Sequence, residues 1–292
     1  MKAHRFDYVR PTRLEHAIEV LAEYGDQAKV IAGGQSLVPM LAFRLTAPRF
    51  LVDIGRLPNL NRITIDNGGI RIGALVRWRD IECSAELKLA HPLLVEAIRH
   101  VAHYQIRNRG TVGGSLAHAD PAAELPGIAL TCGAEILVAG RHGQRTIPAD
   151  EFFIGPLSTS LQQDELIVEL RLPLWRTGRH WAFEEFSRRR GDFALVGVVL
   201  FYDPGKNGRA ESVQIGAIGV ADTPIRLTAA ESVVQGKAIT DAIVREAGAA
   251  ASESVHPADD IHAPAAYRRA LIGVLTERAL VRASGLSLKE HA

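Results

Sequence analysis

Two short glycine-rich segments constrain this chain more than any other feature of its sequence. Ala32-Gly33-Gly34-Gln35-Ser36 and Thr111-Val112-Gly113-Gly114-Ser115 each hold an adjacent pair of glycines closed by a small polar residue. A glycine pair lets backbone N–H groups turn toward one point and approach a ligand without a Cβ in the way. Such concavities bind anions, phosphate above all. Two of them on one chain predict a pyrophosphate held from two sides, and therefore a large dinucleotide.

The composition is that of an ordinary globular protein. The 292 residues predict two domains of roughly 150 residues each. A hydrophobic fraction of 47% and a charged fraction of 23% are sufficient for a packed core. The net charge of +1 gives no electrostatic reason to expect binding to nucleic acid or to an anionic membrane.

The two cysteines, Cys83 and Cys132, stand alone in the sequence. They form neither a disulfide framework nor a CxxC signature of a metal or cluster site, which is typical of a reducing compartment. The charged and polar start of the chain is not typical of a secretory signal. The longest apolar run, Phe193–Tyr202, is about half of what a membrane-spanning helix needs. We therefore expect a cytoplasmic protein without a membrane span.

The hydrophobic periodicity predicts an α+β chain. Thr12 and Glu15 have the spacing of a capping box ahead of a helix that Gly25 ends. An amphipathic helix is expected over Pro92–Tyr104, and Asp120 is expected to cap a further helix that begins with a proline. Strands are expected over residues 29–31, 50–54, 62–65, 69–72, 136–139, 165–172, 181–186, 195–201 and 213–218, and later helices over 228–234, 241–251 and 264–283.

The first glycine-rich segment leads into a further predicted helix. Leu37, Val38, Met40, Leu41 and Leu45 have the spacing of a helix packed on the core. The start of such a helix presents free N–H groups and the positive end of its dipole to an anion.

Several common sites are not supported. The sequence has no G-x-G-x-x-G followed by an acidic residue about 20 positions later, and no P-loop motif, so NAD in a doubly wound domain and a P-loop ATPase are disfavoured. His118 and Asp120 lack the third ligand that a metal site needs. Ser36 and Ser115 lie outside a G-x-S-x-G elbow, which gives a hydrolase little support.

Segments spread along the whole chain form a specific combination. They are Phe6-Asp7-Tyr8-Val9-Arg10-Pro11, Ala32-Gly33-Gly34-Gln35-Ser36-Leu37-Val38-Pro39, Thr111-Val112-Gly113-Gly114-Ser115-Leu116-Ala117-His118-Ala119-Asp120-Pro121, Arg190-Gly191-Asp192-Phe193-Ala194 and Gly219-Val220-Ala221-Asp222-Thr223-Pro224-Ile225-Arg226. In this order and spacing they resemble the FAD-binding medium subunit of molybdenum hydroxylases. That family includes the medium subunit of carbon monoxide dehydrogenase and the flavin domain of xanthine dehydrogenase.

The resemblance implies a fold in two parts. Residues 1–176 would form a FAD-binding domain of the vanillyl-alcohol-oxidase type, with subdomains of about 1–57 and 58–176. Residues 177–292 would form a smaller C-terminal α+β domain, with the breaker-rich stretch 173–180 at the boundary.

The resemblance also implies which residues hold the cofactor. Both glycine-rich segments would hold the FAD pyrophosphate, with Lys29 near the adenine side and Asp120 near the ribityl or pyrophosphate region. The segment around Asp192 and Phe193 would approach the isoalloxazine ring. The expected cofactor-binding residues are Lys29, Ala32, Gly33, Gly34, Gln35, Ser36, Leu37, Thr111, Val112, Gly113, Gly114, Ser115, Ala119, Asp120, Asp192 and Phe193.

The sequence departs from many relatives at a few of these positions. Gln35-Ser36 stands where relatives have Thr-Asp or His-Ser, and Ser115 where they have Asn, so a polar donor is kept. Phe193 falls where some relatives place a Tyr near the flavin, so a hydroxyl is lost there. No motif for covalent flavin attachment is present, and the expected FAD is non-covalent.

The role implied by the resemblance is electron transfer. A small subunit with two [2Fe–2S] clusters would pass electrons to the FAD, a large subunit with the molybdenum cofactor would hydroxylate the substrate, and the complex would be a dimer of heterotrimers. Each cluster needs four cysteines and this chain has two, so the clusters are expected elsewhere. No catalytic residue and no metal ligand is assigned to this chain.

Other functions stay open at this stage. One alternative is a self-contained FAD-dependent oxidase or dehydrogenase, and another is a scaffold that has lost its flavin. Intact glycine pairs disfavour the scaffold, because glycine carries an entropic cost elsewhere. The sequence does not indicate the organic substrate or the terminal electron acceptor.

Overall fold

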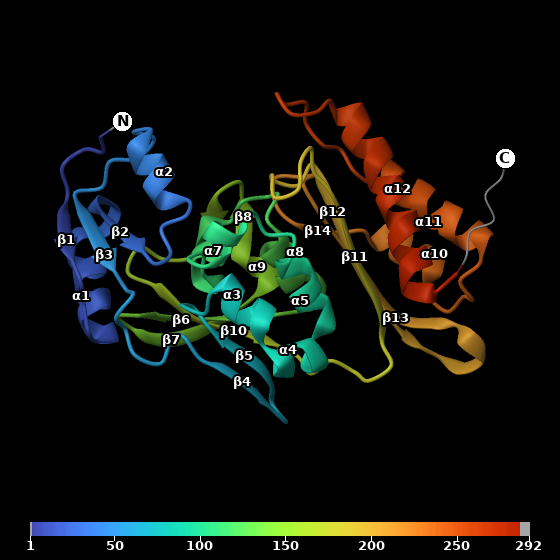
Figure 1. Cartoon of the computed structure of the whole chain (residues 1–292), viewed down its shortest axis with the longest axis horizontal. Helices are drawn as coiled ribbons and strands as arrows, with labels where there is room; N and C mark the ends of the chain where they lie inside the picture. The colour runs from blue at the N-terminus through green and yellow to red at the C-terminus, as the bar shows by residue number, and fades with distance from the viewer. Residues whose placement is uncertain (1, 287–292) are drawn as a thin grey trace. The chain divides into compact units, whose positions relative to one another are not determined.

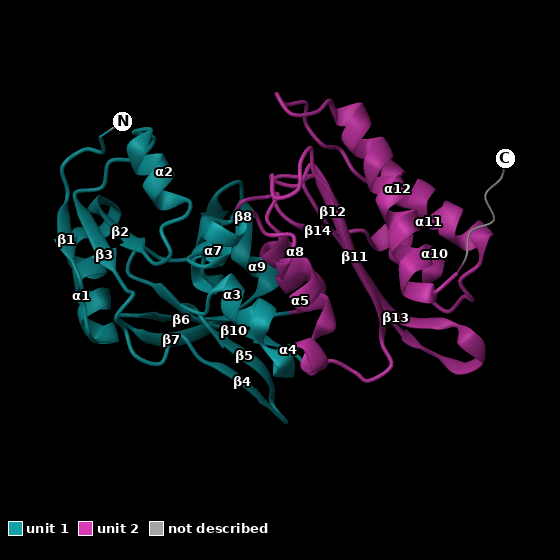
Figure 2. Ribbon diagram, viewed as in Figure 1, with its two compact units in different colours: residues 1–87, 103–119, 134–173 teal, residues 88–102, 120–133, 174–292 magenta. Residues whose placement is uncertain are grey.

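The computed structural model describes residues 2–286, which form two compact units (Figures 1 and 2). Unit 1 comprises the residues up to 87 with 103–119 and 134–173, and unit 2 comprises 88–102, 120–133 and the residues from 174 onward. Two segments that precede the boundary predicted at residue 176 therefore belong to unit 2. That boundary and the two subdomains stay predictions.

A small parallel sheet with two helices makes up the N-terminal part of unit 1 (Figure 1). Its strands lie in the order β1-β3-β2. Ala17, Ile18 and Leu21 recur at helical spacing on α1 and are buried in the core that this helix shares with β2 and β3. The elements are β1 (Asp7–Val9), α1 (Leu14–Tyr24), the 3₁₀ turn η1 (Gly25–Gln27), β2 (Ala28–Ile31), α2 (Leu37–Ala42) and β3 (Phe50–Asp53).

The two ends of α1 differ in how well the sequence predicts them. Gly25 takes a positive φ of 50° and its N–H donates to the Leu21 carbonyl, which confirms the expected stop. At the other end Arg13 is the N-cap and no side chain caps the helix. The capping box predicted for Thr12 and Glu15 is therefore wrong.

The helix predicted after the first glycine-rich loop is present as α2, but it is short and only one of its residues is buried. Leu41 is its buried residue. Val38 is 50% exposed, and Leu45, which lies beyond the end of the helix, is 73% exposed. The expected packing on the core therefore holds for Leu41 and is wrong for Val38 and Leu45.

The larger sheet of unit 1 is antiparallel, in the order β4-β5-β10-β6-β7. The expected hairpin about Asn67 is present, since Asp66 pairs with Gly69. Its strands are β4 (Ile63–Asp66), β5 (Gly69–Gly73), β6 (Glu135–Gly140), β7 (Gly143–Pro148) and β10 (Leu166–Leu172), with the small pair β8 (Phe153–Gly155) and β9 (Ser158–Thr159) beside it. The helices associated with it are α3 (Trp78–Cys83), α6 (Tyr104–Arg107), α7 (Val112–His118) and α9 (Ala149–Phe152), while α4 (Ala85–Ala90) spans the change from unit 1 to unit 2.

Unit 2 is built on an antiparallel sheet in the order β11-β12-β13-β14 (Figure 1). Helices α10, α11 and α12 lie on one side of it, and α5 and α8 lie on the other. Because helices cover both faces of this sheet, every residue of β12 except the last is buried. The elements are α5 (Pro92–Ile98), α8 (Glu124–Thr131), β11 (His180–Phe186), β12 (Val196–Pro204), the 3₁₀ turn η2 (Lys206–Gly208), β13 (Ala210–Ile218), β14 (Ile225–Arg226), α10 (Thr228–Val234), α11 (Asp241–Glu253) and α12 (Ala265–Ser284). Within residues 2–286 no helix combines the length and the hydropathy needed to cross a membrane.

Two helix predictions in this part of the chain need correction. The helix predicted over Pro92–Tyr104 ends as α5 at Ile98, and Ala102 takes a positive φ of 42°. The helix that Asp120 was expected to cap begins at Glu124 with Ala123 at its N-cap. The Asp120 carboxylate instead accepts the Ala122 N–H at 2.8 Å, a local turn that satisfies the carboxylate before the helix starts.

Candidate cofactor-binding site

The first glycine-rich loop joins β2 to α2 and leaves its backbone donors free. Ser36 is the N-cap of α2, and Gly34 takes a φ of 74°, which favours glycine. Within residues 2–286 the N–H groups of Gly33, Gly34, Gln35 and Ser36 donate to no acceptor. The Gln35 amide folds back and donates to the Gly33 carbonyl at 3.0 Å, which holds the loop in shape. A row of unpaired N–H groups on one short loop is the donor set that a diphosphate requires.

The second glycine-rich loop lies directly against the first. A Cβ added at Gly33 would stand 2.1 Å from the Arg109 carbonyl oxygen and 3.0 Å from the Gly110 Cα. Only a residue without a side chain permits this approach. Gly110 in turn packs on the Trp78 indole, where an added Cβ would be 2.7 Å from Nε1. The structure therefore brings together the two segments that the sequence places far apart.

In the second loop the backbone N–H groups are hydrogen-bonded within the protein, unlike those of the first loop. The Val112 and Gly113 N–H groups donate to the carbonyls of Val76 and Ala74, at 3.0 and 2.8 Å. The Gly114 N–H donates to Thr111 Oγ1 at 3.2 Å, which caps α7. The expectation that both glycine pairs turn free N–H groups toward a ligand is therefore wrong for these groups.

Close packing explains the first glycine of this second pair. A Cβ at Gly113 would be 2.6 Å from the Ala74 Cβ, so the glycine lets α7 sit tightly on the chain that follows β5. Gly114 is exposed and Ser115 is half-buried, and these are the residues that the loop presents outward. The second loop thus supports the first and adds a small surface and a hydroxyl beside it.

The remaining predicted residues fall in both units. Lys29 is exposed on β2 in unit 1. Ala119 ends α7 with a φ of 50°, and its carbonyl accepts the Leu157 N–H, so its position is fixed by the backbone. Asp192 and Phe193 belong to unit 2, in the loop between β11 and β12, where Phe193 is 73% exposed.

Residues that support the loops carry no signal that the sequence analysis used. The Trp78 indole packs on Gly110 and the Ala74 carbonyl accepts the Gly113 N–H, and these two contacts hold the second loop in place. The Arg109 backbone contacts Gly33 of the first loop. Trp78 and Ala74 lie outside the motifs used in the sequence analysis. Gly110, which stands three positions ahead of Gly113, does mark a close approach, since it packs on the Trp78 indole.

One buried and one half-buried carboxyl group lie in unit 2, Glu124 at the start of α8 and Glu185 on β11. Burial raises the pKa of Glu124 to about 7, with a further contribution from the charge of Asp120. Burial and the charge of Glu124 together raise the pKa of Glu185 to about 8. Among the described residues Glu185 Oε2 has no hydrogen-bond partner. Burial is the larger cause of both raised pKa values, because it disfavours the charged form of a carboxyl group.

Comparison with known proteins identifies the family to which the chain belongs. The family model described as the FAD binding domain in molybdopterin dehydrogenase matches residues 4–175. The model of the CO dehydrogenase flavoprotein C-terminal domain matches residues 181–283. Together they account for both ends of the described chain.

Individual relatives match over almost their whole length. The chain is 41% identical over 283 residues to the 6-hydroxypseudooxynicotine dehydrogenase complex subunit alpha of Paenarthrobacter nicotinovorans, covering 97% of this chain and 96% of that protein. It is 37% identical over 277 residues to the carbon monoxide dehydrogenase medium chain of Hydrogenophaga pseudoflava, covering 94% and 96%. A solved structure of carbon monoxide dehydrogenase from Hydrogenophaga pseudoflava, lacking the Mo-pyranopterin moiety of its cofactor, matches with a TM-score of 0.94 at 36% identity, covering 99% of this chain and 100% of that chain.

Fold, loops and relatives together define a class, the flavoprotein subunits of molybdenum-containing dehydrogenases. The chain belongs to the family of FAD-binding medium subunits that includes the carbon monoxide dehydrogenase medium chains and the xanthine dehydrogenase FAD-binding subunits. It is an oxidoreductase subunit and its cofactor is FAD. The resemblance and the α+β fold expected from the sequence are confirmed.

The cap of α7 gives a first testable prediction. Thr111→Val removes the hydroxyl that accepts the Gly114 N–H and leaves that donor unpaired. The free energy of unfolding is expected to fall by about 1 kcal/mol, measured by urea unfolding of the FAD-free chain. Thr111→Ser keeps the acceptor and should stay close to the natural protein, whereas equal losses for the two variants would contradict the cap.

Proposed function

We propose that this chain is the electron-transfer subunit of a molybdenum hydroxylase, in which the free N–H groups of Gly33, Gly34, Gln35 and Ser36 bind the FAD pyrophosphate. The observation that carries the proposal is this unpaired row, held against the second loop at Gly33. The FAD supplies the redox chemistry through its isoalloxazine ring. The chain binds and orients it, and needs no acid or base of its own for that task.

The other predicted site residues have assigned roles in this proposal. Ser115 and Gly114 lie beside the pyrophosphate, Lys29 lies toward the adenine, and Asp120 lies toward the ribityl chain. Phe193, with the neighbouring Asp192, approaches the isoalloxazine ring. The roles of Ser115, Gly114 and Lys29 rest on the family resemblance and on the adjacency of the two loops in unit 1. The roles of Asp120, Asp192 and Phe193 rest on the resemblance alone.

The electrons are proposed to come from a partner. A [2Fe–2S] cluster needs four cysteine ligands, and this chain has two cysteines, Cys83 exposed and Cys132 buried. Among the described residues no group of His, Cys, Asp and Glu is arranged to hold a metal ion. We therefore propose a small subunit with two clusters, a large molybdopterin subunit, and a dimer of heterotrimers in the cytoplasm.

The organic substrate is a property of the proposed large subunit. Two similar relatives are named for a nicotine derivative and for carbon monoxide, so one flavoprotein fold serves unlike substrates. The terminal acceptor is external to the chain.

Purification of the tagged chain from its native cell tests the proposal. We expect a yellow complex with oxidised-flavin absorbance, iron–sulfur absorbance and molybdenum. The isolated chain should bind FAD, and organic substrates of the complex should leave that flavin oxidised. A colourless chain that takes up no FAD would count against the proposal, and substrate-dependent bleaching of the isolated chain would favour a self-contained oxidase instead.

A further inference from the structure

The turn that ends α2 in unit 1 holds an arginine in a backbone conformation that glycine favours. Arg44 takes a φ of 59°. Its N–H donates to the Leu41 carbonyl at 3.1 Å. The Leu45 N–H donates to the Met40 carbonyl at 2.9 Å. These two bonds form a Schellman motif, whose left-handed position is usually a glycine because a side chain is strained there. The geometry of the helix end therefore does not explain why this residue is an arginine.

The same turn exposes two large apolar side chains. Phe43 is 66% exposed and Leu45 is 73% exposed, one on each side of Arg44 in the sequence. A Schellman motif is frequently accompanied by an apolar contact between the residue after the turn and the end of the helix. Leu45 stays mostly exposed, so such a contact does not bury it. Grouped exposed apolar side chains are typical of a surface that binds another molecule.

Basic residues from the start of the chain lie beside this turn. The Arg44 guanidinium donates to the Lys2 carbonyl at 3.4 Å, so the start of the chain lies at the end of α2 (Figure 1). The Asp7 N–H donates to the Arg49 carbonyl at 2.7 Å, and residues 2–7 therefore run beside residues 44–49. A shallow groove on this face is lined by His4, Arg5, Phe6, Asp7 and Arg49. We refer to the following residues as the N-terminal basic surface: Lys2, Arg5, Phe6, Phe43, Arg44, Leu45 and Arg49.

The charge of this surface differs from that of the chain as a whole. The net charge of the chain is +1, yet the surface gathers four cations, Lys2, Arg5, Arg44 and Arg49. Within residues 2–286 none of these four forms an ion pair with a carboxylate. An acidic surface would supply the missing partners and would be attracted over a distance.

The residue types favour a protein as the occupant. Arginine and aromatic side chains are enriched in protein–protein interfaces, where lysine is depleted, and three of the four cations are arginines. A planar guanidinium can bind a carboxylate through two parallel hydrogen bonds. Phe43 and Leu45 beside Arg44 add the apolar contacts that such an interface needs at its centre. The surface therefore fits an acidic face of another protein that also carries apolar side chains.

Helix α2 links this surface to the first glycine-rich loop. The helix begins after Ser36, inside the loop, and its six residues end immediately before Phe43. Six helical residues span about 9 Å, so a protein bound at this surface lies beside the loop proposed to bind the FAD pyrophosphate. Of the two proposed partner subunits, the small cluster-bearing subunit has to lie near the FAD, because it passes electrons to it.

We propose that the N-terminal basic surface binds an acidic, partly apolar face of the cluster-bearing subunit, with Arg44 at the centre of the contact. The inference rests on the proposed function, which supplies that subunit. It assigns a role to the strained arginine and to the two exposed apolar side chains that the fold of this chain does not use.

Opposite effects on stability and on assembly test the role of Arg44. Arg44→Gly removes the charge but suits the left-handed turn, so the urea midpoint of the isolated full chain should equal or exceed that of the natural chain. In the complex purified through the tagged chain, the same variant should carry at least about tenfold less iron per FAD. Natural iron content in Arg44→Gly would overturn the proposal. Iron loss together with a lowered midpoint would make Arg44 a structural residue and would also overturn it.

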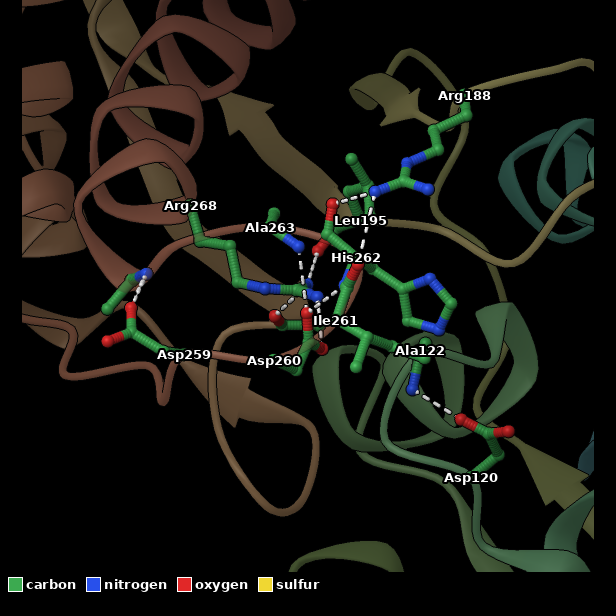
Figure 3. Close-up of polar contacts among 12 residues, drawn as sticks. Asp120, Ala122, Arg188, Leu195, Asp259, Asp260, Ile261, His262, Ala263 and Arg268 are labelled. Carbon is green, nitrogen blue, oxygen red and sulfur yellow. Dashed lines mark hydrogen bonds and ion pairs between the residues drawn. The ribbon is translucent and has the colours of Figure 1, made fainter.

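An exposed aliphatic residue outside the surface supplies the matched control. Leu45→Ser is expected to lower the iron content per FAD by about tenfold. Ile261 is 90% exposed in unit 2, on a loop that Asp260 and Arg268 hold in shape (Figure 3). Ile261→Ser should keep the natural iron content. Equal losses in Leu45→Ser and Ile261→Ser would contradict a specific contact at this surface.

Zero-length cross-linking of the purified complex identifies the occupant. Arg44→Lys keeps the charge, so its complex should retain iron, and it places an amine at the centre of the surface. Carbodiimide joins an amine to a carboxylate in contact with it. Peptides that contain position 44 are expected to be joined to acidic peptides of the cluster-bearing subunit. Links to the molybdopterin subunit alone, or no links, would overturn the proposal.

Two further outcomes separate this proposal from others. Sedimentation of the natural complex with phosphatidylglycerol vesicles, abolished by Arg44→Gly, would assign the surface to a membrane and overturn the protein contact. If the tagged natural chain carried no iron, the proposed function itself would fail. A natural complex that keeps its iron in Arg44→Gly and Leu45→Ser would instead leave the proposed function intact and refute only the assignment of this surface.

Discussion

Gly33→Ala is expected to weaken FAD binding by about 100-fold, the largest loss among single changes at the site. The new Cβ would stand 2.1 Å from the Arg109 carbonyl oxygen, an atom of the second loop's backbone. Relief of this clash requires the two loops to separate by roughly 1 Å. The free N–H groups of the first loop would then lose the alignment that binds a diphosphate. Overpacking should also lower the free energy of unfolding by about 1–3 kcal/mol.

The affinity is measured by titrating the FAD-free chain and following the quenching of flavin fluorescence. Gly155→Ala is a matched control in the same unit, because its Cβ would meet only the Ser158 Cβ, at 3.9 Å. That variant should bind FAD like the natural chain. If Gly33→Ala binds as tightly as Gly155→Ala, the contact between the loops is not part of the cofactor site.

The first loop could be predicted from the sequence because its signals are local. A short apolar strand at Lys29-Val30-Ile31 leads directly into Gly33 and Gly34, and a helix pattern follows. Each of these features depends on neighbours along the chain. The contact between Gly33 and Arg109 could not be predicted in this way, because it depends on how two distant segments pack.

The second loop shows that the same Gly-Gly motif can be required for a different structural reason. The Gly113-Gly114 pair looks like Gly33-Gly34 in the sequence, and the same free donors were expected for both. Ala74 lies against Gly113, and its carbonyl accepts the Gly113 N–H. This N–H is therefore not free to bind a ligand. A glycine pair in the sequence indicates that a side chain would not fit at that position. Only the tertiary structure shows whether the space is taken by a ligand or by another part of the protein.

The ends of the helices were predicted least well, because contacts with distant parts of the chain help to determine where a helix stops. The apolar periodicity beyond Ile98 favours a longer helix, yet α5 stops there and the following turns tighten. The His100 ring packs edge-on against the Phe183 ring, with 4.9 Å between the ring centroids. The apolar periodicity of the sequence does not indicate this contact. Aspartate is a residue type that often caps helices, but the Asp120 carboxylate accepts the Ala122 N–H in a local turn and does not cap α8.

Glu185→Gln is expected to stabilise the protein by about 2 kcal/mol at pH 8 and to change little at pH 5. The pKa of Glu185 is raised from 4.5 to about 8 by burial and by the charge of Glu124. Below pH 4.5 the carboxyl is protonated in the folded and the unfolded chain, and ionisation costs nothing. As the pH rises from 4.5 toward 8, the unfolded chain releases the proton first, so the free energy of unfolding of the natural protein falls. Glutamine keeps the shape of the side chain and has no proton to release.

Urea unfolding at pH 5 and at pH 8 measures this difference, and the neighbouring residue supplies the control. Glu184 lies next to Glu185 on β11, but its carboxylate pairs with Arg282 at 3.1 Å. Glu184→Gln loses that partly exposed ion pair, so at pH 8 it should be neutral or destabilising by less than about 1 kcal/mol. Adjacent substitutions of the same kind are thus expected to act in opposite directions, because one carboxyl faces an arginine and the other faces a second buried acid. If Glu185→Gln lost stability between pH 5 and pH 8 as steeply as the natural chain, Glu185 would not be the group that holds the proton.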